Sequence, residues 1–224
     1  MKRTERNGLI NLLKAAGTVI SFACFALILS GCGLIPTTPN PRFYVLGTAS
    51  ENLLSRKINI SSNVLIGVGP VKIPEYQNRP QMVTQDKEKM IKFAQFDRWG
   101  ESLDIGMERV IGEDLLVMLS GAQVALYPWN QSFEVKYQVV VEIIQLDSEL
   151  DKDLLLVAQW TVIDTQDSKT IMIKRSEFRH PIIPQNYSGL VKTLSIACGS
   201  LSKEIADELE PILNAKKEAQ KSKE

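Results

Sequence analysis

Three stretches in the second half of the chain alternate apolar and polar residues, and this pattern constrains the fold more than any other feature. They span residues 135–143, 156–162 and 171–178. A period of two places every second side chain on the same face of a sheet. Consecutive strands with one apolar face predict an antiparallel meander that buries this face under a second layer.

Two other stretches repeat apolar residues every three or four positions, as amphipathic helices do. The first begins near Leu103 and is stopped by Gly121, and the second begins after Pro184. The second stripe consists of Tyr187, Leu190, Val191, Leu194, Cys198, Leu201, Ile205, Leu209 and Ile212. The sequence therefore predicts an α+β fold, an antiparallel sheet with two amphipathic helices packed on one face.

Shorter patterns predict further strands before the first helix. Residues 43–46 are typical of a short strand, and residues 63–73 of a longer one in which glycines and Pro70 mark a bulge or an edge. Residues 81–84 and 90–94 predict a hairpin across a charged turn.

The N-terminus has the three parts of a secretion signal. A basic segment, residues 1–6, precedes an apolar run over residues 15–29, which is followed by Leu29-Ser30-Gly31-Cys32. The apolar run is about 15 residues long, short of the roughly 20 that span a bilayer. We interpret residues 1–31 as a signal peptide. The alternative, a transmembrane anchor with an incidental cysteine, lacks the charge cluster that stops transfer.

Leu29-Ser30-Gly31-Cys32 resembles the lipobox of bacterial lipoproteins. The resemblance implies that the Cys32 thiol receives a diacylglycerol, that the chain is cleaved between Gly31 and Cys32, and that the new amine is acylated, for example with palmitate. Only a thiolate serves well as the nucleophile at this position. Each buried methylene contributes about 0.8 kcal/mol, so three acyl chains would hold the protein on the membrane essentially permanently.

The residues after Cys32 predict a tether and a sorting destination. Three prolines within residues 36–41 disfavour helix and strand, so residues 32–41 are predicted to form an extended, Pro-rich tether. Residue 33 is Gly rather than the Asp that typically retains enterobacterial lipoproteins in the inner membrane. This resemblance implies an outer-membrane lipoprotein that faces the periplasm. The predicted domain covers residues 42–213, and residues 214–224 are predicted to be a charged, flexible tail.

Charge and motif content narrow the function of the part after the signal peptide. The chain has 26 basic and 26 acidic residues, and removing the four basic and one acidic residue of 1–31 leaves 22 and 25, a net charge of about −3. Without a basic stripe, nucleic-acid binding is not expected. No phosphate-binding loop, metal-ligand spacing or catalytic serine motif is found, so we expect no cofactor, no metal and no catalytic residue. His180 and Cys198 are the one pair to inspect for a hydrolase.

Two motifs make the chain recognisable. One runs from Ile66 to Thr84 and includes Gly69-Pro70-Val71 and Arg79-Pro80-Gln81; the other is Phe96-Asp97-Arg98-Trp99 before the first helix. With the lipobox and the strand at 43–46, they resemble the ABC-type transport auxiliary lipoprotein family, which includes the lipoprotein of the paraquat-inducible locus. Arg79, Pro80, Gln81 and Trp99 are candidates either for partner binding or for a structural role. For Arg79 a partner contact and an intramolecular brace of the hairpin are both left open, whereas Trp99, just before a helix, is interpreted as a core or staple residue rather than an exposed anchor.

The resemblance implies a non-catalytic periplasmic subunit of an intermembrane lipid transport system. Its partner would be an inner-membrane protein with mammalian-cell-entry (MCE) domains, and its link to the membrane would be the lipid on Cys32. Whether the chain forms a homo-oligomer stays open. The alternatives are a scaffold lipoprotein for outer-membrane or cell-wall assembly and a periplasmic hydrolase.

Overall fold

The computed structural model describes residues 17, 39–48, 57–60 and 64–221. The chain divides into two units, residues 1–40 and 41–224, and all the strands and the helices α2 and α3 belong to the second. The predicted signal peptide, apart from Gly17, and the predicted tether up to residue 38 lie outside the described residues. So do the lipidation site Cys32 and the cleavage site Gly31.

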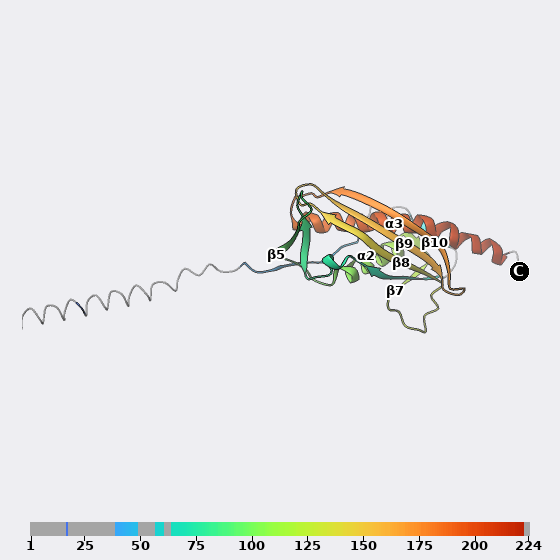
Figure 1. Ribbon diagram of the computed structural model, residues 1–224. Helices are drawn as coiled ribbons and strands as arrows, with labels where there is room; N and C mark the ends of the chain where they lie inside the picture. The colour runs from blue at the N-terminus through green and yellow to red at the C-terminus, as the bar shows by residue number, and fades with distance from the viewer. Residues whose placement is uncertain (1–16, 18–38, 49–56, 61–63, 222–224) are drawn as a thin grey trace, which may run out of the picture. The chain divides into compact units, whose positions relative to one another are not determined.

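A five-stranded sheet forms the centre of unit 41–224 (Figure 1). Its strands, in order across the sheet, are β10 (Lys169–Pro181), β9 (Asp153–Asp164), β8 (Tyr137–Ser148), β3 (Leu65–Lys72) and β7 (Gln123–Leu126). Strands β8, β9 and β10 pair antiparallel, which confirms the predicted meander. Strand β3 pairs parallel with both β7 and β8, so the sheet is mixed.

A second, three-stranded sheet lies beside the large one. It has the order β1 (Arg42–Tyr44), β5 (Ile91–Trp99) and β4 (Gln81–Gln85), and a short 3-10 helix, η2 (Glu75–Gln77), precedes β4. The antiparallel pair β4–β5 is the predicted hairpin, whereas β1 pairs parallel with β5. Two two-residue strands, β2 (Ile58–Asn59) and β6 (Leu119–Ser120), form a small parallel pair.

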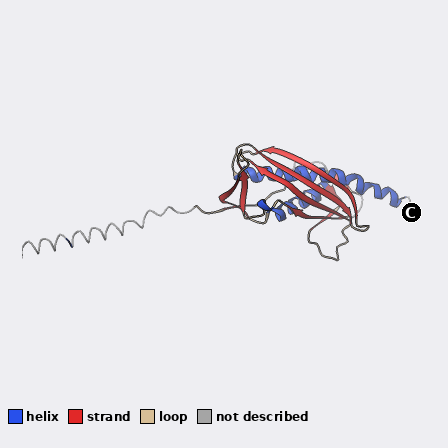
Figure 2. Ribbon diagram, in the orientation of Figure 1, coloured by secondary structure: helices blue, strands red, loops and turns tan. Residues whose placement is uncertain are grey.

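Two helices cover the large sheet, α2 (Leu103–Met118) and α3 (Tyr187–Lys221) (Figure 2). The apolar faces of both helices and of the long strands belong to a single core, in which Trp160 is fully buried. The predicted α+β class is therefore confirmed. Helix α3 continues into the predicted tail 214–224 as far as Lys221. Among the described residues, no helix combines the length and the apolar character needed to cross a membrane.

The small sheet and the β7–β8 connection lie at opposite ends of unit 41–224. Figure 1 shows β5 at the end where the chain enters the unit, and the long connection after β7 at the other end. This arrangement separates the surface around β1 and β5 from the surface around the β7–β8 connection.

Candidate functional site

The strand by which the chain enters the domain is held by a buried carboxylate. Asp97 on β5 is 3% exposed and accepts hydrogen bonds from Arg42 Nη2 at 2.8 Å and from the Tyr44 hydroxyl at 2.9 Å. Burial and the neighbouring Asp97 raise the pKa of Tyr44, so its hydroxyl stays a donor at neutral pH. Asp97 thus fixes β1 to β5 from the inner side.

The segment after β1 is held as well. The Gly100 amide donates to the Tyr44 carbonyl at 2.7 Å, and Arg109 on α2 donates to the Leu46 carbonyl at 2.9 Å while it binds Glu101 at 2.7 Å. These bonds come from two different elements. The chain is therefore attached at several points immediately after it enters the domain.

The structure brings the residues of the two sequence motifs together. The Trp99 amide donates to the Pro80 carbonyl at 2.8 Å, and Gln81 lies opposite Arg98 in the β4–β5 register. Arg79 donates from Nε to the Tyr76 carbonyl at 3.0 Å and lies 4.2 Å above the ring centre of Phe93. Arg79 is thus a brace between η2 and β5.

Trp99 is 8% exposed and belongs to the core. Among the four motif residues, Pro80 is exposed, and Arg79 and Gln81 are half-buried. These contacts account for the residues by local structure. A role in partner binding stays a prediction for them.

The Gly69-Pro70-Val71 motif forms a bulge in β3 that is filled by a helix side chain. The pairing register between β3 and β8 shifts between Val68 and Val71, and Gly69 has a φ of +110°. Glu108 on α2 accepts a hydrogen bond from the Val71 amide at 3.3 Å. Burial raises the pKa of Glu108, although backbone hydrogen bonds from Val71 and Tyr127 partly offset that rise. A side chain at Gly69 would place its Cβ 2.2 Å from Glu108 Oε2.

The second surface is built on the connection between β7 and β8, residues 127–136. Two adjoining hollows of about 540 and 790 Å³ share Leu65, Trp129 and Phe133, and we call them together the β7 groove. The Trp129 ring lies against Gly67 on β3, where an added Cβ would come within 2.7 Å of the ring. Glycine at this position therefore lets the connection fold back over the sheet.

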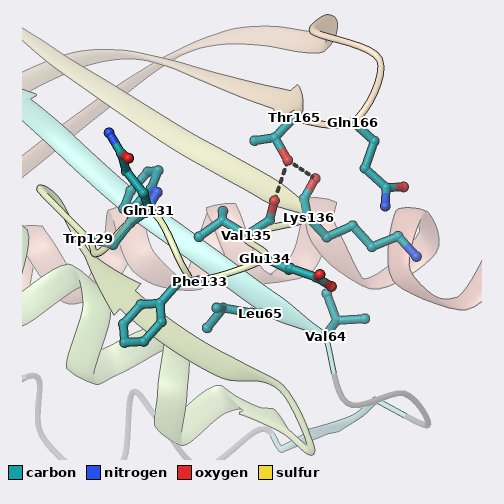
Figure 3. Close-up of a pocket in the computed structure, with 10 residues that line it drawn as sticks. All are labelled: Val64, Leu65, Trp129, Gln131, Phe133, Glu134, Val135, Lys136, Thr165 and Gln166. Carbon is teal, nitrogen blue, oxygen red and sulfur yellow. Dashed lines mark hydrogen bonds between the residues drawn. The ribbon is translucent and has the colours of Figure 1, made fainter.

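The two hollows of the β7 groove differ in polarity. The smaller one has no charged residue in its lining, which consists of Leu65, Leu116, Gln123, Val124, Ala125, Leu126, Pro128, Trp129, Asn130 and Phe133. The larger one, drawn in Figure 3, adds Glu134, Lys136, Thr165 and Gln166 at its rim. The Thr165 hydroxyl donates to the carbonyl of Val135 and so ties the end of the connection to the β9–β10 turn.

Several large apolar side chains of this region are exposed to solvent. Phe133 is 51% exposed, Leu116 52% and Leu126 39%. The Tyr127 and Trp129 rings meet edge to face at 5.6 Å between ring centres. The smaller hollow, which is open and has no charged lining residue, suits the binding of an apolar side-chain cluster of a partner better than that of a small charged substrate.

Cys198 and His180 do not form a nucleophile and base. Cys198 is fully buried on α3, and burial raises the pKa of its thiol to about 12. The thiol is therefore protonated at neutral pH and unreactive. The imidazole of His180 lies 3.4 Å from the Ser200 hydroxyl, and its burial lowers the pKa of His180. Within residues 39–48, 57–60 and 64–221, no group of three His, Cys, Asp or Glu side chains could hold a metal ion.

Sequence reasoning missed the β7 groove and Glu108. A signal for the groove was present, because Trp129 and Phe133 stand in a connection marked by Pro128 and Asn130. Aromatic residues in a surface connection are more often functional than aromatic residues in a strand. No comparable signal marked Glu108, which the helical pattern places among polar residues of α2.

The architecture and surfaces together define a two-layer α+β domain with a firmly attached N-terminal strand at one end and, at the other, an open groove that is apolar in its smaller hollow. The model of the family described as ABC-type transport auxiliary lipoprotein component matches residues 44–206. The chain belongs to this family, which confirms the resemblance found in its motifs. Membership implies an association with an ABC transport system and a lipid anchor in a membrane. A comparison with curated proteins gives no match.

Solved structures show the same fold. A protein described only as uncharacterized is 18% identical, with a TM-score of 0.63 over 76% of this chain and 99% of that one. A protein from Xanthomonas campestris, assigned to a family of unknown function, is 11% identical, with a TM-score of 0.61 over 80% of this chain and 99% of that one. At such identities the likeness concerns the fold alone.

Proposed function

We propose that the chain is a lipid-anchored periplasmic protein of the outer membrane that serves as a non-catalytic auxiliary subunit of an MCE/ABC-type intermembrane lipid transport system. The observation that carries the proposal is the family match, which covers residues 44–206 and so nearly the whole domain. The lipid on Cys32 would hold the protein at the membrane, and the domain would act by binding an MCE-domain protein of the inner membrane.

The two ends of the domain are suited to these two roles, anchoring and partner binding. The Asp97 contacts with Arg42 and Tyr44 fix the strand that follows the tether. The β7 groove, at the other end, exposes Leu116, Leu126 and Phe133. Anchoring raises the effective concentration of the groove for a partner that reaches the same membrane, so a weak docking contact would be sufficient.

The experiment is the capture of partners by the lipidated protein from cross-linked cell membranes. An MCE-domain protein is expected among the captured proteins. A double variant, Leu126→Ser with Phe133→Ser, is expected to reduce its capture at least about tenfold, because loss of one buried apolar anchor typically costs about 2 kcal/mol or more. The matched control is Ile173→Ser on β10, which removes an apolar side chain that is 61% exposed but lies outside the groove.

Other outcomes would refute the proposal. Capture of outer-membrane assembly or cell-wall synthesis proteins in place of an MCE-domain protein would assign the chain to a scaffold role. An equal loss of capture with Ile173→Ser and with the double variant would refute the docking role of the groove. Mass spectrometry that finds an unmodified sulfur at Cys32 would refute the anchor.

A further inference from the structure

Exposed apolar side chains lie along the small sheet, whose strand β1 begins where the chain enters the domain. Phe43 and Val45 are 64% and 58% exposed, and Met90, Ile91 and Phe93 of the β4–β5 hairpin are 56%, 42% and 51% exposed. These five residues are called the entry face. An exposed apolar cluster of this kind usually marks a surface that is covered in the working protein.

The backbone fixes the direction in which the entry face points. Arg42 and Tyr44 both bind Asp97, so they lie on the inner side of β1, and Phe43 between them points outward. On β5, Ala94 is buried in the core, so Phe93 beside it points outward as well. The contacts of Asp97 thus hold Phe43 outside the core, where it has no role in packing.

Basic side chains lie beside residues of the entry face, and one of them, Lys92, is paired with Asp86 of the hairpin turn at 3.3 Å. Arg98 lies opposite Phe43 in the β1–β5 register, Arg79 stacks on Phe93, and Lys92 precedes Phe93 on β5. Apolar and aromatic side chains with interspersed Lys and Arg are the combination that lies in the headgroup region of a bilayer. The stems of these residues would pack beside the aromatic rings while their charges reach the lipid phosphates.

The length of chain before β1 limits where this face can be. Ten residue steps separate Cys32 from Arg42, and a fully extended chain of that length spans at most about 36 Å. With lipid on Cys32, Arg42 cannot be farther than this from the membrane, and Phe43 is the next residue. The β1 part of the entry face, Phe43 and Val45, is therefore the part of the domain closest along the chain to Cys32, whereas the β7 groove is at the other end of the domain (Figure 1).

We propose that the entry face lies against the bilayer to which Cys32 is anchored, with Phe43 and Val45 in the headgroup region, so that the domain is held in one orientation on the membrane. The inference rests on the proposed lipidation of Cys32, and goes beyond it by assigning a second, direct membrane contact to the folded domain. The consequence is that the β7 groove points away from the membrane.

The test uses the lipidated full-length protein in vesicles of phosphatidylethanolamine with a minor fraction of phosphatidylglycerol. Because Cys198 is fully buried and Cys32 carries lipid, one introduced cysteine gives one labelling site. An environment-sensitive fluorophore is attached to Phe43→Cys or Met90→Cys, and to the controls Phe133→Cys in the β7 groove and Ile173→Cys on β10. Lipids with brominated acyl chains are expected to quench the first two labels and to leave the two controls unquenched.

A second variant separates the apolar contact from the anchor. Phe43→Ser with Val45→Ser, labelled at Met90→Cys, is expected to lose the quenching while the protein still floats with the vesicles. Thermal unfolding of the same variant is expected to be unchanged, because both side chains are already exposed.

Each other outcome would refute a different part of the inference. Flotation with equal quenching at all four sites, or with quenching at Phe133→Cys alone, would show that the entry face does not rest on the bilayer. Quenching at position 90 that survives the serine variant would refute the role of Phe43 and Val45. Shielding of position 43 only when an MCE-domain protein is added would make this face a protein interface. Failure of the protein to float would refute the lipid anchor itself.

Discussion

Asp147, at the end of β8, joins the small sheet to the large one, and its replacement gives the sharpest test of this joint. The carboxylate is 8% exposed and accepts hydrogen bonds from Gln85 Nε2 on β4 and from Gln145 Nε2, each at 2.6 Å. Lys89 in the β4–β5 turn lies 3.3 Å away. Asp147→Ala removes these contacts, and a longer one from the Tyr76 hydroxyl at 3.5 Å, from the turn end of the hairpin that carries three of the five entry-face residues.

The magnitude follows from the two amide contacts. A hydrogen bond to an ionised acceptor contributes about 1.5–3 kcal/mol, and contacts that share one acceptor are less than additive. The Lys89 side chain is 62% exposed, so its ion pair adds little. We expect Asp147→Ala to lower the free energy of unfolding by about 2–4 kcal/mol. For a domain of this size such a loss lowers the midpoint of thermal unfolding by roughly 5–15 °C.

Urea denaturation and calorimetry of wild type and variant measure the effect. The matched control is Asp151→Ala, which removes an exposed carboxylate 3.7 Å from Lys87 near the same hairpin and is expected to change nothing measurable. Hydrogen exchange is expected to rise in β4 and β5 more than in α3 for Asp147→Ala alone. If the free energy of unfolding of Asp147→Ala is within about 0.5 kcal/mol of wild type, Asp147 does not join the two sheets. An equally large loss in Asp151→Ala would refute this role as well.

Three further predictions concern the core and the β3 bulge. The Cys198 thiol, whose pKa is raised to about 12 by burial, is expected to react with maleimide only after the protein is unfolded; stoichiometric labelling of the folded protein would contradict its burial. Because burial raises the pKa of Glu108, the folded state holds that proton more tightly than the unfolded state. The free energy of unfolding of wild type, measured against Glu108→Gln, is therefore expected to rise as the pH falls from neutral toward the ordinary value of 4.5, and a constant difference would refute this. Gly69→Ala is expected to cost about 1–3 kcal/mol, because φ is +110° and the Cβ would meet Glu108, whereas Gly47→Ala, with no atom within 4 Å, is expected to cost little in the same urea series.

The long strands and helices could be predicted because the spacing of their apolar residues follows which side chains are buried. Every second residue of β8 from Tyr137 to Ile143 is buried, and on β9 Trp160 between Gln159 and Thr161 is fully buried. Trp99, interpreted as a core residue, is 8% exposed in the core cluster. Each of these positions is decided by its own neighbours within a few residues, which is the range over which a pattern can be recognised.

Pairing partners far apart in the sequence could not be predicted. Strand β3 lies between β7 and β8 with parallel pairing on both sides, and nothing within its eight residues indicates this. Strand β7 has only four residues, too few for a reliable alternation. The β7 groove depends on both, because Trp129 can cover Gly67 only when β7 and β8 flank β3. The groove is thus a product of topology, and the sequence marks only its aromatic side chains.

The two proposals, tested together, determine how far from the membrane the domain offers its groove. Helix α3 runs along the sheet from the β5 end (Figure 1), and its 35 residues at about 1.5 Å each measure roughly 52 Å. If the entry face lies on the bilayer, the β7 groove stands at most about that far above it, whatever the tether does. If only the lipid holds the domain, the tether adds up to about 36 Å of free reach.

Lengthening the tether with Gly-Ser repeats separates the two cases. A membrane-bound entry face makes partner capture insensitive to the insertion, and a freely tethered domain makes it change with length. Insensitivity together with full quenching at position 43 would support both surfaces, whereas a steady change of capture with linker length would refute the fixed orientation and leave the docking groove in place.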